Sequence, residues 1–272
     1  MKKFDGILMV TDLDGTLLRN DKSVSEENLR AIEYFKSQGG TFSFITGRIP
    51  AGADHIYNIV KPNAPCGCIN GGGIYDYRTE KMLWCDNLTQ DVYDIVEYID
   101  KNNSSIGIEV NSYYKIFFCK KNSSTEKHRF NEKFPDLEAH YREIKEPIAK
   151  ILFADEDEEN LLKVIDMLKN HPKSTDYDFI RSDKEYYELL PKGASKGNVM
   201  IKLAKILGMD IKKTISVGDN DNDVSMLKNA KIGFAVSNAT KSAKAAADYV
   251  TVSNEEHAIA KIIDDLDKGL IL

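Results

Sequence analysis

Two aspartates one residue apart, Asp12 and Asp14, follow the apolar run 7–10 and precede Gly15 and Thr16. Carboxylates placed in this way can act as a nucleophile or as an acid and base, and they can hold a cation. The glycine permits a tight turn that exposes backbone N–H groups, and the threonine can hydrogen-bond an anion. The segment therefore indicates chemistry, while a surface turn built on the aspartate side chains is the alternative for this motif alone.

A second acidic segment, GDNDND at 218–223, follows the apolar run 214–217 and opens a predicted helix. It contains Asp219, Asp221 and Asp223, and acids spaced this closely need a cation. A calcium-binding EF-hand loop would have a glycine after alternating aspartates, a later glutamate and flanking helices, whereas this segment follows a strand. We therefore predict an active-site metal, and hard oxygen ligands without histidine or cysteine favour magnesium over zinc.

Two weaker signals stand at another predicted strand end and at a helix start. Thr46 and Gly47 follow the strand-like run 41–45, where a hydroxyl and an unobstructed N–H could bind a phosphate oxygen. Many strand-to-helix turns carry the same pair without such a role. Lys196 stands in the first turn of a predicted helix, where the helix dipole disfavours a cation. It indicates a nearby negative charge or, alternatively, a solvated surface lysine.

Strand and helix patterns at the two ends of the chain place these residues. The runs 7–10 and 41–45 are typical of buried strands in a parallel sheet. Between them the sequence predicts a helix over 23–38, with Ser23 and Glu26 as a possible capping box. Ligands bind at the carboxyl ends of strands in open α/β sheets, which is where the polar motifs stand.

Two further elements are expected beside these. The segment 69–75, which includes a run of three glycines, looks like the end of a third strand and a flexible crossing near the site. A helix that begins near Lys196 is expected to bury Met200, Leu203 and Ile206 on one face.

The middle of the chain, from about 83 to 189, has a different character. Its pattern is antiparallel α+β, and the strand–helix rhythm of the N-terminus returns after it. We therefore expect a second domain inserted into the first. Its predicted elements are a helix over 88–101, a hairpin of strands over 106–110 and 113–119, a strand over 150–154, a helix over 156–170, and two short strands of which the last covers 186–190.

The composition is that of an ordinary soluble globular protein. The 272 residues are comfortable for two domains, and 42% are hydrophobic. A net charge of −6 argues against nucleic acid or an anionic membrane as a general partner. No apolar run approaches the ~20 residues of a membrane helix, and the N-terminal apolar run is too short for a secretion signal, so we expect a cytoplasmic protein. The cysteines, expected to be free thiols, are Cys66, Cys68, Cys85 and Cys119.

Four motifs occur in one characteristic order: DLDGT at 12–16, TGR at 46–48, KG at 196–197 and GDNDND at 218–223. In this order and context the chain resembles the haloacid dehalogenase-like phosphatase superfamily, and within it the Cof-type sugar-phosphatase-like branch with a type IIB cap. The resemblance covers essentially the whole chain. One departure is Asp221, where relatives usually have Gly or Glu, and we expect it to add negative charge near the metal.

The resemblance implies an α/β fold with a doubly wound, Rossmann-like parallel-sheet core and an inserted α+β cap. The core would comprise residues 1–82 and 190–272, and the cap residues 83–189. The cap would close over the active site and select the substrate.

The same resemblance implies a magnesium-dependent phosphatase that hydrolyses small phosphorylated metabolites through an aspartyl-phosphate intermediate. The catalytic residues would be the nucleophile Asp12, the general acid and base Asp14, and Lys196. Magnesium would be held by Asp12, the Asp14 backbone carbonyl, Asp219 and Asp223. Asp223 would either bind the metal directly or hold one of the residues that do. The phosphate would be bound by Leu13, Thr46, Gly47, Lys196 and Asn222.

Two alternatives remain open at this point. One is a phosphomutase or another phosphotransferase of the same fold, and the other is a non-catalytic protein that binds phosphorylated metabolites. The acid at Asp14 argues against the phosphate-transporting ATPases of this fold, which usually lack it. No feature of the sequence selects the ester or the oligomeric state. Conceivable substrate contacts in the insert are Tyr113, Lys115, Arg181 and Asp183.

Overall fold

The computed structural model describes residues 2–271, which form two compact units. The first unit comprises the chain up to Gly47, Ala53–Trp84 and the chain from Ser195 onward, and the second comprises Arg48–Gly52 and Cys85–Ala194. Strand pairing explains why the boundaries differ from 82 and 190. The strand β5 (Lys81–Cys85) pairs with a strand of the first unit, and β10 (Tyr186–Pro191) pairs with strands of the second.

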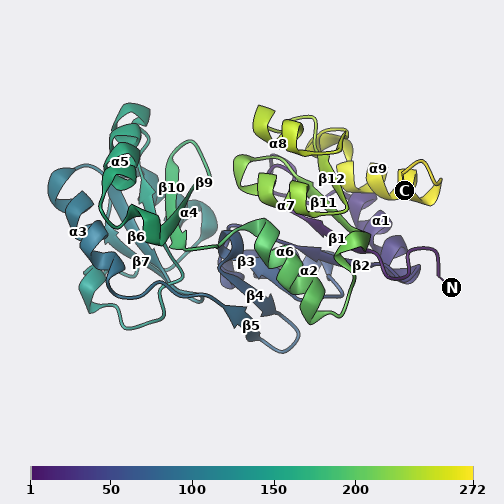
Figure 1. The fold of residues 1–272 in the computed structure, drawn as a ribbon, viewed down its shortest axis with the longest axis horizontal. Helices are drawn as coiled ribbons and strands as arrows, with labels where there is room; N and C mark the ends of the chain where they lie inside the picture. The colour runs from purple at the N-terminus through teal and green to yellow at the C-terminus, as the bar shows by residue number, and fades with distance from the viewer. Residues whose placement is uncertain (1, 272) are drawn as a thin grey trace. The chain divides into compact units, whose positions relative to one another are not determined.

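A five-stranded parallel sheet forms the middle of the first unit (Figure 1). Leu8 lies opposite Thr41 on one side and Thr214 on the other, and every residue of the central strand β1 is buried. The predicted strand buried on both faces of a parallel sheet is thus confirmed. Across the sheet the strands are β13 (Tyr249–Val250), β12 (Ile232–Ala235), β11 (Thr214–Gly218), β1 (Leu8–Thr11) and β2 (Thr41–Phe44).

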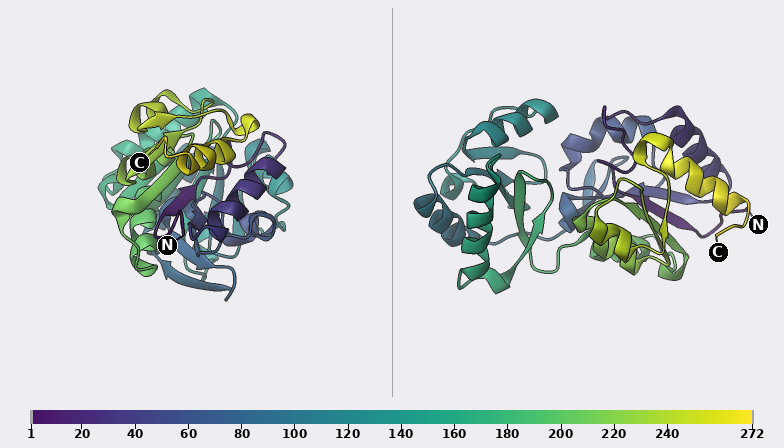
Figure 2. Two further views of the ribbon diagram at one scale, coloured as in Figure 1. Left: turned by 90° about the vertical axis from the view of Figure 1, so that its right-hand side faces the viewer. Right: turned by 90° about the horizontal axis from the view of Figure 1, so that it is seen from above.

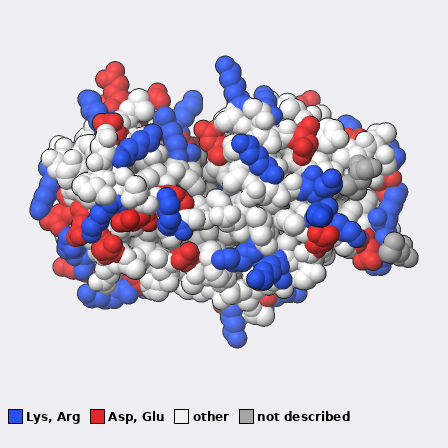
Figure 3. Space-filling model, in the orientation of Figure 1, with Lys and Arg blue, Asp and Glu red and all other residues white. Residues whose placement is uncertain are grey.

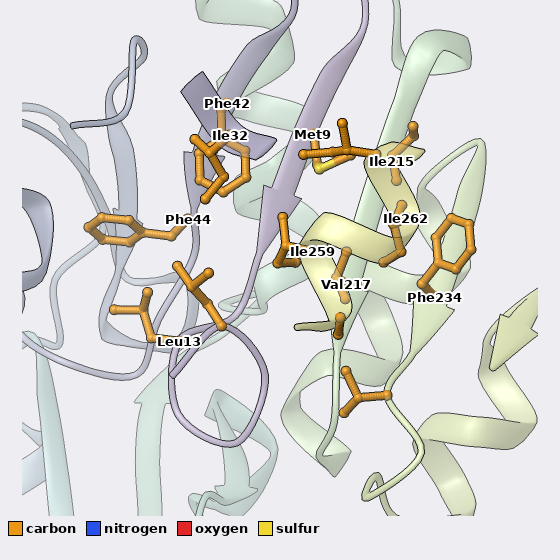
Figure 4. Packing of buried hydrophobic residues seen from close by; sticks show 14 of the residues in the cluster. Met9, Leu13, Ile32, Phe42, Phe44, Ile215, Val217, Phe234, Ile259 and Ile262 are labelled. Atoms are coloured by element: carbon orange, nitrogen blue, oxygen red, sulfur yellow. The ribbon is translucent and has the colours of Figure 1, made fainter. Parts of the chain in front are cut away.

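Helices cover both faces of this sheet (Figures 1 and 2). They are α1 (Glu26–Ser37), α2 (Pro50–Val60), α6 (Lys196–Ile206), α7 (Val224–Asn229), α8 (Lys241–Ala246) and α9 (Ala258–Asp267). Successive side chains of a strand point to opposite faces. Met9 therefore packs with residues of α1 and α9, as Figure 4 shows, while Leu8 and Val10 pack with residues of α6 and α7. This arrangement confirms the predicted doubly wound core.

Two predicted helix details are wrong. The N-cap of α1 is Ser25, whose side chain accepts the N–H of Asn28, because the backbone N–H and hydroxyl of Ser23 instead bind Asp21 Oδ1. Ile206 is 43% exposed and does not join the buried face of α6. The 3.6-residue period places Leu207, seven positions after Met200, against that core instead.

The segment 66–85 reverses direction instead of ending a third strand of the core sheet. It forms an antiparallel sheet of β3 (Cys66–Cys68), β4 (Gly73–Asp76) and β5, with Cys66 opposite Tyr75. A buried turn over Ile69–Gly71 joins β3 to β4. A parallel bridge between Ile45 and Gly67 places β3 next to the end of β2. The predicted strand end lies at Cys68, where β3 stops, whereas the rest of the segment forms a buried turn and β4 instead of a crossing.

The second unit is built on a five-stranded antiparallel sheet of order β7-β6-β8-β10-β9. The helices α3 and α5 pack on one face of it, and the predicted hairpin and the strand over 150–154 are confirmed. The polar helix α4 was not predicted, because it lacks a clear apolar face. The elements are α3 (Val92–Asn102), β6 (Gly107–Asn111), β7 (Ile116–Lys120), α4 (Ser123–Glu132), β8 (Lys150–Ala154), α5 (Glu158–Asn170), β9 (Tyr177–Arg181) and β10.

Two expectations about the whole chain can be compared with the described residues. All four cysteines are free thiols, as predicted. Over residues 2–271, no helix combines the length and the apolar character needed to cross a membrane.

Candidate active site

The first aspartate of the DLDGT motif stands at the carboxyl end of β1. The Asp12 N–H donates to Val217 O at 2.9 Å, which continues the pairing of β1 with β11, and its side chain is buried. The next residue, Leu13, places its side chain in the hydrophobic core (Figure 4), and its carbonyl accepts the N–H groups of Thr16 and Leu18. The core thus anchors the turn that carries the two aspartates.

The ends of β1 and β11 approach each other closely at Gly15. Thr16 Oγ1 donates to Asp219 Oδ1 at 2.8 Å, across 203 positions of sequence. Gly15 has a φ of 77°, and a Cβ there would lie 2.6 Å from Asp219 Oδ2. A glycine is therefore required both by the left-handed backbone and by the space that Asp219 occupies.

Lys196 joins the two acidic segments. Its Nζ lies 2.6 Å from Asp12 Oδ1 and 2.6 Å from Asp223 Oδ1, and only 1% of its side chain is exposed. Ser195 caps α6 by accepting the N–H of Asn198, so the helix start fixes where the lysine side chain begins. The expectation that Lys196 answers a negative charge is confirmed, and the surface alternative is excluded.

Asp223 is held by both of its carboxylate oxygens. Oδ1 accepts from Lys196, and Oδ2 accepts the backbone N–H groups of Asp219 at 2.8 Å and Asn220 at 3.0 Å. These bonds fold the acidic segment back on itself and orient the lysine.

Negative charge exceeds positive charge in this cluster. Burial raises the pKa of Asp12 well above its usual value; Lys196 opposes this, while Asp223 and Asp219 add to it. Burial, with the charge of Asp223, raises the pKa of Asp219 to about 6. Burial disfavours the Lys196 ammonium, but the charges of Asp12 and Asp223 raise its pKa above the usual value. A further cation would be stabilised here.

The donor set fits a hard cation. One oxygen from each of Asp12, Asp219 and Asp223 can be chosen so that all three lie within 4.8 Å of one another. Carboxylate oxygens without histidine or cysteine suit magnesium or calcium better than zinc. The side chain of Asp14 is not one of this group.

Asp14 instead faces the loop that follows it. Its Oδ1 lies 2.7 Å from Lys22 Nζ, and 37% of its side chain is exposed. Glu255 fastens the same loop by accepting from Arg19 Nε at 3.0 Å and from the Asn20 N–H at 2.7 Å. The ion pair of Lys22 with Asp14 was not predicted from the sequence. Lys22 has a left-handed backbone, with a φ of 66°, and no sequence motif indicates it.

Thr46, Gly47 and Asn222 are connected by a residue that the sequence reasoning missed, Asn70. The Asn70 N–H donates to Thr46 O at 3.0 Å, and its Oδ1 accepts from Asn222 Nδ2 at 3.0 Å. A Cβ on Gly47 would lie 2.9 Å from the Asn70 amide atoms. An asparagine before a glycine run does signal a turn, but its neighbours come from distant segments.

The departure at Asp221 is structural. Its Oδ1 accepts from Thr240 Oγ1 at 3.1 Å and from Ser242 Oγ, both at the start of α8. Asp221 does not belong to the group of three carboxylates, Asp12, Asp219 and Asp223, that could hold a metal ion. The hydroxyls at the start of α8 hold the Asp221 carboxylate, and the expectation that it adds negative charge near the metal stays a prediction.

Lys196→Met is expected to destabilise the metal-free protein by about 3–5 kcal/mol, because it leaves buried carboxylates without their cation. Urea unfolding in EDTA measures this. Lys205→Met is the matched control, since Lys205 is an exposed lysine on the same helix. A loss below about 1 kcal/mol, the size of a surface ion pair, would show that Lys196 does not hold the cluster together.

Comparisons with known proteins identify the family of the chain. Residues 9–263 match the family model described as haloacid dehalogenase-like hydrolase. The chain is 29% identical over 280 residues to "Putative phosphatase YxeH" of Bacillus subtilis, covering 95% of this chain and 97% of that protein. It is 28% identical over 283 residues to the 5-amino-6-(5-phospho-D-ribitylamino)uracil phosphatase YwtE of the same organism, covering 95% and 97%.

A solved structure shares the fold. The HAD subclass IIB sugar phosphatase BT4131 superposes with a TM-score of 0.82 at 21% identity, covering 97% of this chain and 100% of that one.

Proposed function

Because the chain belongs to the haloacid dehalogenase-like hydrolase family and is a phosphatase, we propose that it hydrolyses small phosphorylated metabolites with magnesium, through a phosphoaspartate on Asp12. The observation that carries this proposal is the buried triad in which Lys196 lies 2.6 Å from both Asp12 and Asp223. A carboxylate that attacks a phosphate dianion is repelled by the like charge of the phosphate. Lys196 is paired with the attacking Asp12 carboxylate, and its positive charge reduces this repulsion.

In the first step Asp12 attacks phosphorus, and the bond to the ester oxygen breaks. Thr46, the Gly47 N–H, the Leu13 N–H and Asn222 hold the oxygens over which charge spreads. The Asp12 carboxylate, the Asp14 backbone carbonyl and Asp219 would hold magnesium, which would supply further positive charge at the phosphoryl group. Asp223 is a positioning residue in this proposal, because its two oxygens already bind Lys196 and the backbone.

Asp14 serves both steps as the proton carrier. It protonates the leaving alkoxide and then accepts a proton from the water that cleaves the phosphoaspartate. Its partial exposure and its exposed ion pair with Lys22 support this role. Exposed ion pairs of this kind contribute little free energy, so the carboxylate can leave Lys22 at small cost.

The substrate class rests on two relatives. One is named for a phosphorylated ribitylamino uracil and the other for sugar phosphates, so we propose a phosphorylated sugar or sugar alcohol. The proposed roles of the first unit concern the phosphate and the metal. We therefore propose that the second unit selects the organic part of the substrate. Acidic and basic side chains are interspersed over the face shown in Figure 3.

Hydrolysis of an aryl phosphate and of a panel of sugar phosphates, with magnesium and with EDTA, tests the proposal. We expect turnover of the aryl ester with magnesium, selectivity among the sugar phosphates, and no turnover in EDTA. Full activity in EDTA would contradict the metal assignment, and no turnover of any ester would contradict the phosphatase proposal.

Magnesium is expected to raise the melting temperature more at pH 8 than at pH 5. The pKa of Asp219 is about 6 when folded, above its usual 3.8, so a proton competes with the metal at pH 5. For the same reason this group makes the metal-free protein less stable as the pH rises through 4 to 6. Asp219→Asn should abolish the magnesium shift and Asp221→Asn should retain it. An equal shift at both pH values would contradict the prediction.

A further inference from the structure

The turn between β3 and β4 has an unusual backbone. Ile69, Asn70 and Gly71 have φ values of 55°, 50° and 110°, three left-handed residues in succession. A β-branched residue such as Ile69 rarely adopts this conformation, and such strain persists only where the surroundings impose it. All three residues are fully buried in the first unit. Folding therefore maintains a costly turn at this place.

That turn contacts three segments that carry predicted site residues. Its Asn70 N–H binds Thr46 O, and its Asn70 side chain binds Asn222 and packs against Gly47. A Cβ on Gly71 would lie 2.4 Å from the backbone of Ser195, the residue that caps α6 directly before Lys196. The turn is thus wedged among loops that follow β2 and β11 and that precede α6.

The orientation of Asn222 depends on this contact. Asn222 Nδ2 donates to Asn70 Oδ1, and Asn222 Oδ1 is buried without a hydrogen-bond partner among the described residues. A primary amide has two N–H donors, so one N–H bound to Asn70 fixes the direction of the other. If the Asn222 amide were rotated by half a turn, its Oδ1 would face Asn70 Oδ1, and this hydrogen bond would be lost.

We propose that Asn70 is a positioning residue for phosphoryl transfer: it orients the Asn222 amide and fixes the Thr46–Gly47 backbone that binds the transferring group. This inference rests on the proposed function. Hydrogen-bond donors that stabilise the negative charge developing on the phosphoryl group act mainly in the transition state. Misorienting these donors therefore lowers kcat more than it raises KM. Loss of a residue that orients a metal ligand typically costs roughly 10–100-fold, and we expect an effect of the same order for a residue that orients a phosphate-binding amide.

Asn70→Gly is the informative variant, because glycine accepts the left-handed backbone while the whole CH₂–CONH₂ side chain is removed. We expect kcat to fall roughly 10–100-fold with a much smaller change in KM. Inhibition by vanadate, which adopts the five-coordinate geometry of the transition state, should weaken with kcat, and inhibition by inorganic phosphate should change less. Lys61→Gly is the matched control, since Lys61 is exposed and has a φ of 50° in the same unit.

A double-mutant cycle separates positioning from folding. In an Asn222→Ala background, Asn70→Gly should cost much less than in the wild type, because its main route of action is gone. If the wild type is active and Asn70→Gly keeps its kcat, or lowers kcat equally in both backgrounds, the inference about Asn70 is contradicted while the proposed function is not. A wild type that turns over no ester would overturn the proposed function and this inference with it.

Discussion

Replacement of Asp12 by asparagine is expected to lower hydrolysis of every phosphate ester by at least about 10⁴-fold, the scale on which loss of a catalytic nucleophile acts. An amide is a poor nucleophile and a poor metal ligand. The side chain is buried and nearly isosteric with its replacement, so the loss should not come from a changed shape. Steady-state kinetics with an aryl and a sugar phosphate, with magnesium present, measure the effect.

The same variant should not unfold the protein. Burial raises the pKa of Asp12 in the folded state, which means that its charged form opposes folding at neutral pH. A neutral asparagine removes that cost while Lys196 keeps Asp223 as a partner. We expect the metal-free variant to melt no lower than the wild type. Retained activity in a folded Asp12→Asn protein would refute the nucleophile assignment.

Asp14→Asn is expected to separate the two chemical steps. An aryl oxide leaves readily without a proton, so formation of the phosphoaspartate should largely survive with an aryl phosphate. Hydrolysis of that intermediate then lacks its base, and the protein should accumulate with phosphate on Asp12. With a sugar phosphate the alkoxide leaves poorly, and turnover should fall by roughly 10²–10⁴-fold.

Intact-protein mass after rapid acid quench, together with burst kinetics, detects the stalled adduct. Lys22→Met is the control, because it removes the ion-pair partner of Asp14 and keeps the carboxylate. It should turn over both esters without an adduct. Wild-type rates in Asp14→Asn, or an aryl substrate that gives neither a burst nor an adduct, would disprove the two roles of Asp14.

Local patterns of the sequence were enough for the strands and for Lys196. The buried run before Asp12 could only be a central strand or a buried helix segment, and a lysine at a helix start implied a charge nearby. Both predictions are confirmed because each depends on a few neighbouring residues. Ile206 fails because a three-residue spacing drifts off a helix face after two turns.

Contacts between distant segments account for what the sequence did not reveal. Asn70 meets Asn222 across 152 positions, and Asp221 is captured by hydroxyls of a helix that begins about twenty residues later. Neither contact has a signature in the local pattern. The turn at Ile69 even opposes its own residue preference, so a prediction from local propensity had to miss it.

The position of β1 in the middle of the parallel sheet sets the order in which the protein can be completed during synthesis. One neighbour, β2, leaves the ribosome soon after β1, but the other, β11, begins only at Thr214. Until then one edge of β1 has no strand to pair with, and Asp12 lacks Asp223, which follows β11 in the chain. While the whole second unit is being made, the nascent chain therefore carries an apolar strand with one unpaired edge. This is the period in which the chain most needs protection from aggregation.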